Sequence, residues 1–385
     1  MASIKAICVF GTRPEATKMV PLVQALKHQH PSFDTKVIIT AQHRQMLDQV
    51  LKDFDIACDY DLDVMRPNQT LAETTQRVLA GITPVLEKER PDVVLVHGDT
   101  ATTAAAALAS YYLRIPVGHV EAGLRTGDKY APFPEEINRR IADAVADFHF
   151  APTERSKRNL LNEGTSPDSI FVTGNTAVDT LLMTVRDDYR FREERLNEVD
   201  FTSRRNILVE VHRRENFGQG MEDVGDALAT VAGAREDVQL LVSVHRNPNA
   251  REPIMRHLKD SPRTVLFDPI DYPDYVNLMS RSYLIITDSG GVQEEAPSLG
   301  VPTIVCREKT ERPEALDAGT VVLVGTDKRK IVDTACDLLD NTIRYERMSQ
   351  VNNPFGDGRA SERIVHSLMY KFGLRPDRPK DFQVS

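Results

Sequence analysis

Several features that would define a protein class are missing from this sequence of 385 residues. No run approaches the ~18 apolar residues that a membrane-spanning helix needs. The apolar run near the first residues is too short for a secretory signal peptide. The four cysteines lie far apart without a CxxC pair, which argues against a zinc site and is typical of reduced thiols. We therefore expect a cytoplasmic protein with no membrane segment and no bound metal.

An excess of positive charge is also missing. The chain has 48 Lys and Arg against 57 Asp and Glu, a formal net charge of −9. This balance argues against nucleic acid or an anionic membrane as a partner. It does not argue against a phosphorylated small molecule, because a local pocket can be basic on an acidic protein.

The composition is that of a globular protein, with 41% hydrophobic and 27% charged residues. A chain of this length is too long for one ordinary core, so two domains are expected. Short runs apolar on both faces alternate with helical patterns, which predicts parallel sheets covered by helices on both sides. The first set of predicted strands comprises Ile4–Phe10, Lys36–Thr40, Asp92–Gly98 and Val117–Gly123.

The same alternation restarts in the second half of the chain. We expect domains at residues 1–174 and 175–358, followed by a helix and tail at 359–385 that packs back on the first domain. The polar segment 186–205 between the two strand sets is expected to form an early peripheral helix. The fold class is α/β, with two Rossmann-like doubly wound parallel-sheet domains facing across a cleft. The second strand set comprises Asn206–Val211, Val238–Val244, Thr264–Phe267, Tyr283–Thr287, Val301–Val305 and Gly319–Gly325.

Ligands of doubly wound domains bind at the carboxyl ends of the strands, so the residues there are the candidates. The first strand ends in FGTRPE, which is not GxGxxG, so the dinucleotide fingerprint is absent and a nicotinamide dehydrogenase is disfavoured. Arg13 and Lys18 lie at the start of the following helix, where the helix dipole disfavours cations. This placement indicates anion binding.

Carboxylates follow the other strands of the first domain. Asp99 in HGDT could be functional or a helix cap. Glu121 in HVEAGLRTGD is flanked by glycine and is hard to explain by packing, which favours a function. Glu135 and Glu136 in PFPEEINRR open a helix, where the dipole would itself favour them, so a structural role competes with a functional one.

Two neighbouring strands of the second domain end in basic motifs, HRRENFG from His212 and VHRNPN with His245. Two such ends suggest a diphosphate, although a charged surface loop is the alternative for the first. In TDSGGVQEE, Gly290 and Gly291 let backbone N–H groups approach phosphate at a helix start. Glu295 could accept from ribose hydroxyls, or Glu294 and Glu295 could be a solvated first turn.

These seven motifs, with TERPEA as the end of the last, run in order from about Phe10 to Gly358 and resemble the non-hydrolysing UDP-N-acetylglucosamine (UDP-GlcNAc) 2-epimerases. The resemblance implies two domains of the glycosyltransferase-B type, the substrates UDP-GlcNAc and UDP-ManNAc, no cofactor, and a homodimer. It places active-site residues at Arg13, Lys18, Asp99, Glu121, Glu135 and His212, and UDP-sugar contacts at Arg13, Arg213, His245, Ser289, Gly290, Gly291 and Glu295.

Many bacterial members of that family bind a second UDP-GlcNAc as an activator beside the active site. The resemblance carries its contacts to Gln42, Gln45, Glu136, Arg213 and His245. Asn68 departs from the pattern, because regulated relatives tend to have Arg there. Activator dependence therefore stays open.

The family's reaction accounts for this set of residues. The C2 proton is only weakly acidic, so UDP leaves from C1 as that proton departs, and UDP then adds back to 2-acetamidoglucal with the proton on the other face. The leaving diphosphate needs positive charge, which Arg13, His212 and Arg213 can supply. Proton carriers are needed on two faces of the sugar, hence Asp99, Glu121 and Glu135. Which carboxylate abstracts and which delivers stays open.

Three other functions remain as alternatives. A hydrolysing 2-epimerase would pass through the same intermediate and release ManNAc and UDP. A UDP-sugar glycosyltransferase of the same fold would need an acceptor pocket and would have little use for three carboxylates in the first domain. A non-catalytic UDP-sugar sensor is disfavoured by the complete set of catalytic candidates. For the epimerase, surface polysaccharide synthesis is the expected use of the ManNAc product.

Overall fold

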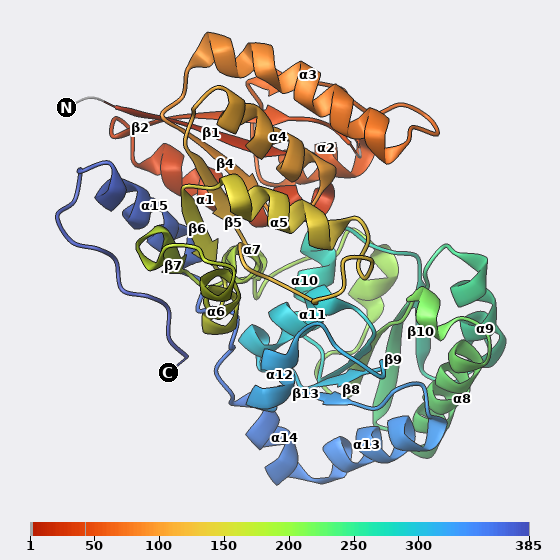
Figure 1. Cartoon of the computed structure of the whole chain (residues 1–385). Coiled ribbons are helices and arrows are strands. Elements are labelled where there is room, and N and C mark those ends of the chain that lie inside the picture. The colour runs from red at the N-terminus through yellow and green to blue at the C-terminus, as the bar shows by residue number, and fades with distance from the viewer. Residues whose placement is uncertain (1–2, 43, 385) are drawn as a thin grey trace. The chain divides into compact units, whose positions relative to one another are not determined.

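The computed structural model describes residues 3–42 and 44–384 of the chain, and of residue 45 only the backbone. Its contacts divide the chain into two compact units, Met1–Thr180 with Phe355–Gln383 and Leu181–Pro354 with Val384–Ser385 (Figure 1). The chain leaves unit 1 within helix α7 (Thr176–Thr184). The domain boundaries expected from the sequence stay a prediction. In the described residues no helix is long and apolar enough to cross a membrane.

Unit 1 is built on a sheet of seven parallel strands in the order β3-β2-β1-β4-β5-β6-β7. The order reverses direction between β1 and β4, which makes this the switch point of the sheet. The strands are β1 (Ile4–Phe10), β2 (Phe33–Ile39), β3 (Tyr60–Asp61), β4 (Val93–His97), β5 (Val117–Val120), β6 (Phe148–Ala151) and β7 (Ile170–Val172).

Helices cover both faces of this sheet. Alternate residues of β1 accordingly pack into two different cores. Ala6, Cys8 and Phe10 belong to one core, and Ile7 and Val9 belong to the other. The helices are α1 (Arg13–His28), α2 (Arg44–Asp53), α3 (Leu71–Glu89), α4 (Ala101–Tyr112), α5 (Glu135–Val145), α6 (Glu154–Asn162) and α15 (Ala360–Lys371), with a 3-10 turn η1 (Pro167–Ser169).

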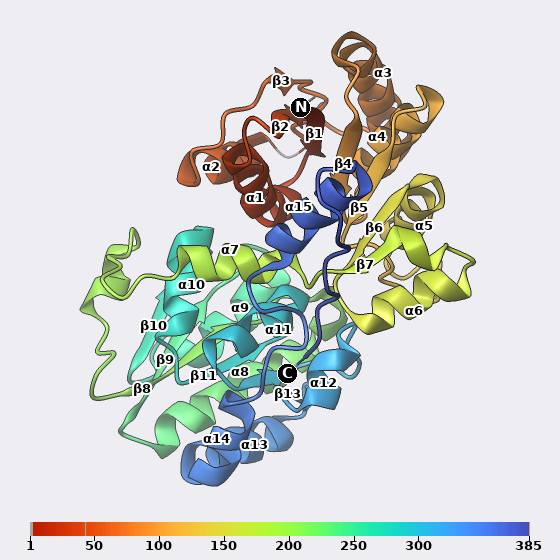
Figure 2. The same ribbon diagram turned by 90° about the vertical axis from the view of Figure 1, so that its left-hand side faces the viewer.

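The first of these cores contains side chains of the last helix as well as the first. Ile364, Val365 and Leu368 of α15 are buried with Met19 and Leu22 of α1. Figure 2 shows α15 beside α1, although more than 300 residues separate them in the sequence. The C-terminal segment is therefore an integral layer of unit 1.

Unit 2 has a sheet of six parallel strands in the order β10-β9-β8-β11-β12-β13, with its switch point between β8 and β11. The strands are β8 (Arg205–Glu210), β9 (Val238–Ser243), β10 (Thr264–Phe267), β11 (Leu284–Thr287), β12 (Thr303–Val305) and β13 (Val321–Leu323). Each predicted strand of the second set overlaps one of these, and the predicted fold class of two doubly wound parallel sheets is confirmed.

The two faces of this sheet also carry separate cores. One holds the apolar sides of α8, α9 and α13 (Figure 1), and the other holds those of α10 and α11. The helices are α8 (Gln219–Ala234), α9 (Pro248–Leu258), α10 (Tyr272–Ser280), α11 (Gly290–Glu295), α12 (Pro313–Ala318), α13 (Lys328–Asp340) and α14 (Thr342–Ser349), with 3-10 turns η2 (Glu194–Glu198), η3 (Arg214–Asn216) and η4 (Ala296–Leu299).

The helix expected within 186–205 is wrong, because this segment holds only the five-residue turn η2. The buried carboxylate of Asp274 accepts the backbone N–H groups of Arg192 and Glu193 and the hydroxyl of Tyr189. These donors are satisfied by a side chain of α10, so the segment follows the surface of unit 2 in an irregular path.

The C-terminal tail pairs with β7, the edge strand of the seven-stranded sheet. Phe382 donates its N–H to the carbonyl of Val172 over 2.7 Å, and Asp381 accepts the N–H of Val172 at 3.1 Å. Arg378 donates to the carbonyl of Ile170. The tail thereby covers backbone groups that an open edge would present to another chain.

A chain that ends at Gly373 should unfold at a lower temperature, by about 5 °C, and should self-associate, because it loses these bonds and exposes the β7 edge. Thermal unfolding and light scattering measure both effects. A chain that ends at Gln383 keeps the pairing and is the control. Equal melting temperatures and equal masses of the particles formed by the two truncated chains would contradict the role of the tail in covering the β7 edge.

Candidate functional site

Most motif residues lie directly after the strands at each switch point or after the strand next to it. In unit 1 the loops at the switch point are those after β1 and β4, and the first begins with Gly11. A Cβ atom on Gly11 would lie 2.0 Å from Oγ1 of Thr40 and 2.5 Å from Oγ1 of Thr102. Only glycine fits at this point, so the loop after β1 runs close against the neighbouring strand and helix.

A buried carboxylate joins these two loops. Glu15 accepts the backbone N–H groups of Gly11 and Thr12 at 3.0 and 2.8 Å, and the hydroxyls of Thr100 and Thr103 at 2.6 and 3.1 Å. With Thr12 it forms the capping box of α1. Burial raises the pKa of Glu15, and the hydrogen bonds from the threonines act against that rise. The loops that carry Arg13 and Asp99 are therefore held by one side chain.

Glu121 is the centre of a charged cluster in unit 1. It adopts a φ of 67°, in the left-handed region, and only 6% of its surface is exposed. Lys18 donates to its carboxylate over 2.5 Å, Asn175 over 3.2 Å and Arg139 over 3.4 Å. Burial opposes ionisation, but the charges of Lys18 and Arg139 outweigh it and hold the pKa of Glu121 well below its usual range.

Arg139 connects this cluster to the loop after β4. Its guanidinium pairs with Asp99 as well as with Glu121, and its neighbour Asn138 donates to the carbonyl of Asp99 over 2.9 Å. Asp99 remains partly exposed, whereas Glu121 is buried. Glu135, half-buried, begins α5 one turn before Arg139, and side chains four residues apart lie on the same face of a helix.

His97, the last residue of β4, lies against the same cluster without a hydrogen bond. Its ring is buried, and neither ring nitrogen has a partner among the described residues. Nε2 is 3.8 Å from the carboxylate of Glu121. Burial lowers the pKa of His97 to about 3, so the ring is neutral at physiological pH.

This neutral histidine should make the fold less stable in acid. The unfolded chain binds a proton at His97 below about pH 6.5 and the folded chain does not, so stability falls as pH drops toward 3. Between pH 7 and pH 5 the loss should be about 2 kcal/mol of unfolding free energy. His97→Leu should remove it in urea denaturation at both pH values. His28→Gln, at an exposed position, should not change the difference. If the difference in unfolding free energy between pH 7 and pH 5 were the same in His97→Leu as in the wild type, His97 could not be neutral in the folded protein.

In unit 2 the loop after β8 brings two basic side chains to the switch point. The ring of His212 stacks on that of His245, which follows β9, with centroids 5.1 Å apart and planes at 18°. Burial and the neighbouring His212 lower the pKa of His245. Arg213 is half-buried, and a Cβ atom on Gly290 would lie 3.8 Å from its Nη2 atom. The loops after β8, β9 and β11 therefore meet.

The loop after β11 is fixed by side chains of its own unit. Ser289 donates its N–H to the hydroxyl of Thr287 over 3.0 Å and precedes α11, whose first residues are Gly290 and Gly291. Glu295, at the end of α11, accepts the hydroxyl of Tyr272 at 3.0 Å. Glu295 thus faces α10 and is not a freely solvated side chain.

Glu294 is buried and forms an ion pair with Arg312 of the TERPEA segment. Thr310 of the same segment donates to the side chain of Gln293 over 2.6 Å. The interpretation of Glu294 as part of a solvated first turn is therefore wrong. The TERPEA motif has a structural partner in α11.

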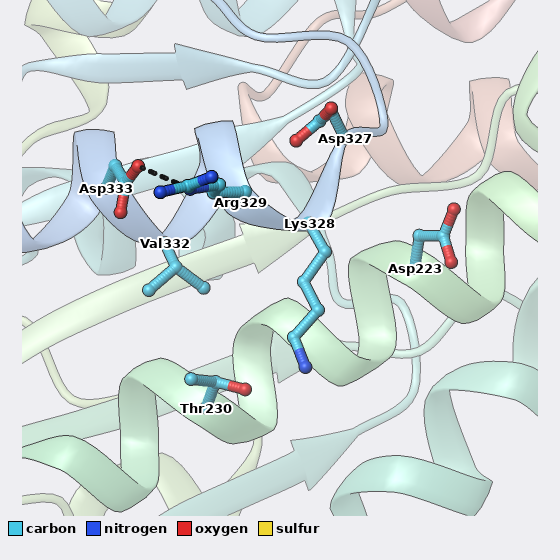
Figure 3. Close-up of a pocket in the computed structure, with 7 residues that line it drawn as sticks. All are labelled: Asp223, Thr230, Asp327, Lys328, Arg329, Val332 and Asp333. Atoms are coloured by element: carbon cyan, nitrogen blue, oxygen red, sulfur yellow. Dashed lines mark ion pairs between the residues drawn. The ribbon is translucent and has the colours of Figure 1, made fainter.

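An open groove lies elsewhere on unit 2, between α8 and α13 (Figure 3). Lys328 in this groove pairs with Asp226 over 2.7 Å, and Arg329 pairs with Asp333 over 3.8 Å. None of the motif residues lines it, so it is not the candidate site. Its lining residues are Asp223, Thr230, Asp327, Lys328, Arg329, Val332 and Asp333. In the described part of the chain no three His, Cys, Asp or Glu residues are grouped as metal ligands.

Comparison with known proteins gives matches over almost the whole chain. The family described as UDP-N-acetylglucosamine 2-epimerase matches residues 24–369. The chain belongs to this family. A UDP-N-acetylglucosamine 2-epimerase of Bacillus subtilis is 52% identical over 382 residues, with 99% of each chain covered. The Escherichia coli K12 enzyme of that name is 53% identical over 371 residues, covering 95% of this chain and 98% of the other.

A solved structure supports the same assignment. The UDP-GlcNAc 2-epimerase of Neisseria meningitidis, bound to UDP-GlcNAc, is 46% identical with a TM-score of 0.86, and 95% of this chain and 100% of that chain are covered. The resemblance to UDP-GlcNAc 2-epimerases read from the motifs is therefore confirmed at the level of the family.

For this member of the UDP-GlcNAc 2-epimerase family, the structure groups the predicted site residues within each unit. In unit 1, Lys18 pairs with Glu121, and Arg139 pairs with both Glu121 and Asp99. Arg13 is exposed at the start of α1. His212, His245, Arg213, Gly290 and their neighbours Ser289, Gly291 and Glu295 gather at the carboxyl ends of β8, β9 and β11 in unit 2.

The residues assigned to a second UDP-GlcNAc differ in burial and in hydrogen-bond partners. Glu136 is 1% exposed and accepts the N–H groups of Thr126 and Gly127 at 3.0 and 3.3 Å, so it anchors the loop after β5. Gln42 is half-buried and accepts the hydroxyl of Thr102 at 3.3 Å. Asn68 is exposed with a φ of 56°. The side chain of Gln45 lies outside the described part, and an activator site stays a prediction.

Sequence reasoning named no role for several residues that organise the site. His119 faces Asp143 over 2.6 Å and the carbonyl of Gly98 over 2.8 Å, and so connects β5, α5 and the loop after β4. Arg139 and Asn175 bind Glu121 directly. His119 and Arg139 lie within the motifs HVEAGLRTGD and PFPEEINRR. Their polar side chains inside these motifs were the signal that could have identified them.

Proposed function

We propose that this protein interconverts UDP-GlcNAc and UDP-ManNAc by epimerisation at C2 of the sugar. The observation that carries the proposal is the Glu121 cluster, in which Lys18 and Arg139 hold two carboxylates after β4 and β5, beside the switch point of unit 1. Family membership supports the substrate class, since the related Neisseria meningitidis enzyme was solved with UDP-GlcNAc bound. The reaction removes and returns a proton at C2 without changing the oxidation state of the sugar.

The charges of unit 1 suit an elimination of UDP from C1. In this proposal the C1–O bond breaks as the C2 proton leaves, which gives 2-acetamidoglucal and UDP, and re-addition delivers the proton to the opposite face. Lys18 and Arg139 add positive charge to the site where negative charge develops. Glu121 stays ionised between them because its pKa is lowered, so it is a poor proton donor, and we assign delivery of the proton to partly exposed Asp99 or half-buried Glu135.

Unit 2 is proposed to hold the nucleotide. Arg213, His212 and His245 supply positive charge or hydrogen-bond donors for the diphosphate at the switch point of its sheet. Gly290 and Gly291 have no side chains that would keep the phosphates from the backbone. A carboxylate oxygen can accept more than one hydrogen bond, so Glu295, oriented by Tyr272, can also accept from ribose hydroxyls.

Proton NMR in deuterium oxide tests the reaction. UDP-GlcNAc is incubated with pure protein without cofactor or acceptor. We expect UDP-ManNAc that carries deuterium at C2. Free ManNAc with UDP as the main products would assign the protein to the hydrolysing 2-epimerases. Substrate that binds but stays unchanged would contradict the proposal and favour a glycosyltransferase or a sensor.

We also propose that the protein works as a homodimer in the cytoplasm and supplies ManNAc for surface polysaccharides. The resemblance of the sequence motifs to this family supports the assembly and the use of the product. Four free cysteines support a reducing compartment. Light scattering should give a mass of twice 43.2 kDa, and a monomeric mass at all concentrations would contradict the dimer.

A further inference from the structure

One carboxylate of unit 2 that no motif role explains lies beneath the candidate nucleotide site. Asp288 follows β11 directly, and none of its surface is exposed. It accepts the backbone N–H of His212 at 2.9 Å and that of Arg213 at 2.8 Å. It also accepts from the amide of Asn216 at 3.0 Å. Among the described residues its only ion-pair partner is the ring of His212, 3.8 Å away.

These bonds determine what the loop after β8 can offer to a ligand. The N–H groups of His212 and Arg213 are directed at Asp288, so these two residues present only their side chains to a bound diphosphate. The amide of Asn216 also donates to the carbonyl of Cys306 after β12, over 3.0 Å. Asp288 therefore joins the ends of three neighbouring strands, β8, β11 and β12.

Burial of such a group needs a reason beyond packing. A carboxylate buried without a lysine or arginine partner costs free energy that an apolar residue would not. Hydrogen bonds from N–H groups reduce this cost and in return give those N–H groups fixed positions. The other switch point has a counterpart in Glu15, which likewise joins the loops after β1 and β4. In each unit one buried carboxylate thus spans the point where ligands bind.

We propose that Asp288 is a positioning residue, which orients the side chains of His212 and Arg213 for a nucleoside diphosphate without touching it. The ligand class rests on the proposed function. Loss of this anchor lets the backbone of residues 212 and 213 shift, and a displacement of about 1 Å of an orienting group can lower a rate about 100-fold. Stability and catalysis should therefore respond separately to a change at this position.

Asp274 offers a matched control within the same unit. It is 1% exposed and accepts the N–H groups of Arg192 and Glu193 at 3.1 and 2.9 Å and the hydroxyl of Tyr189 at 2.7 Å. Its environment resembles that of Asp288, but it anchors the segment before η2 and no motif loop. Asp274→Asn reports the general cost of neutralising a buried, N–H-bonded carboxylate.

The experiment compares Asp288→Asn with Asp274→Asn by amide hydrogen exchange, UDP affinity and turnover. In Asp288→Asn we expect exchange at His212 and Arg213 to speed up at least about tenfold, the Kd for UDP to rise about tenfold, and kcat to fall about 100-fold. In Asp274→Asn we expect faster exchange at Arg192 and Glu193 only, with Kd and kcat within about twofold of the wild type. Should Asp288→Asn not fold, Asp288→Glu keeps the charge, displaces the anchor and serves in its place.

Two outcomes would overturn the proposal. One is unchanged exchange at His212 and Arg213 in Asp288→Asn. The other is faster exchange there with the Kd for UDP and kcat as little changed as in Asp274→Asn. Failure of the proposed function is a different result, because wild-type protein would then not turn over UDP-GlcNAc. Exchange and UDP affinity would still decide whether Asp288 positions the loop.

Discussion

Replacement of Glu121 by glutamine should lower kcat for the interconversion of UDP-GlcNAc and UDP-ManNAc about a thousandfold. Glutamine has nearly the same shape but no charge, so Lys18 and Arg139 lose the anion that holds them 2.5 and 3.4 Å from its oxygens. Arg139 would then keep its ion pair with Asp99, and Lys18 would lose its ion pair with residue 121. Each misplaced charge weakens the stabilisation of the leaving diphosphate or the proton transfer, and such effects are of order 100-fold or more each.

Turnover is measured by NMR of both nucleotide sugars, and deuterium at C2 is followed in the same samples. Glu89→Gln is the matched control in unit 1, because Glu89 likewise pairs with two cationic side chains, Lys5 and Lys36, at 3.3 and 2.7 Å. That variant should change the melting temperature and leave kcat within about twofold. If Glu121→Gln kept kcat within threefold of the wild type, the cluster could not be the reaction centre.

The fold was largely predictable because most of its strands are short apolar runs in a regular alternation with helices. A strand buried on both faces, such as Val93–His97, has a pattern that few other structures share. The strands Phe148–Ala151 and Ile170–Val172 were not predicted. They have four and three residues, too few for a periodic pattern, and the buried His149 interrupts the first. Their position depends on pairing with neighbours that the local sequence does not specify.

The site was predictable at the level of motifs and not at the level of contacts. Glu135 and Glu136 are adjacent, yet the first is half-buried at the start of α5 and the second is buried and binds loop N–H groups. Glu294 and Glu295 differ in the same manner. Successive residues of a helix point about 100° apart, so adjacent carboxylates can meet different surroundings, and only packing decides which of them is buried. Arg139 likewise gains its role from the placement of α5 beside β5.

Arg213→Met should weaken UDP binding about 30-fold, the second large effect that the structure predicts. Nε of Arg213 is buried and has no hydrogen-bond partner among the described residues, and Nη2 lies near the start of α11. A diphosphate bound there would provide the missing acceptors, and hydrogen bonds to a charged group contribute about 1.5–3 kcal/mol each. Methionine keeps the length and apolar packing of the side chain but removes every donor.

Arg214 is the natural control for this change, because it is the next residue in the chain and is exposed in η3. Arg214→Met removes the same formal charge from the protein, so it measures the long-range electrostatic part of the effect. Calorimetry of UDP binding at low and high salt separates this long-range part from the effect of a direct contact. Salt screens long-range attraction but not a contact in the site. We expect Arg214→Met to weaken binding less than threefold at either salt concentration. Equal losses in both variants would mean that Arg213 acts only through its charge and does not contact the diphosphate.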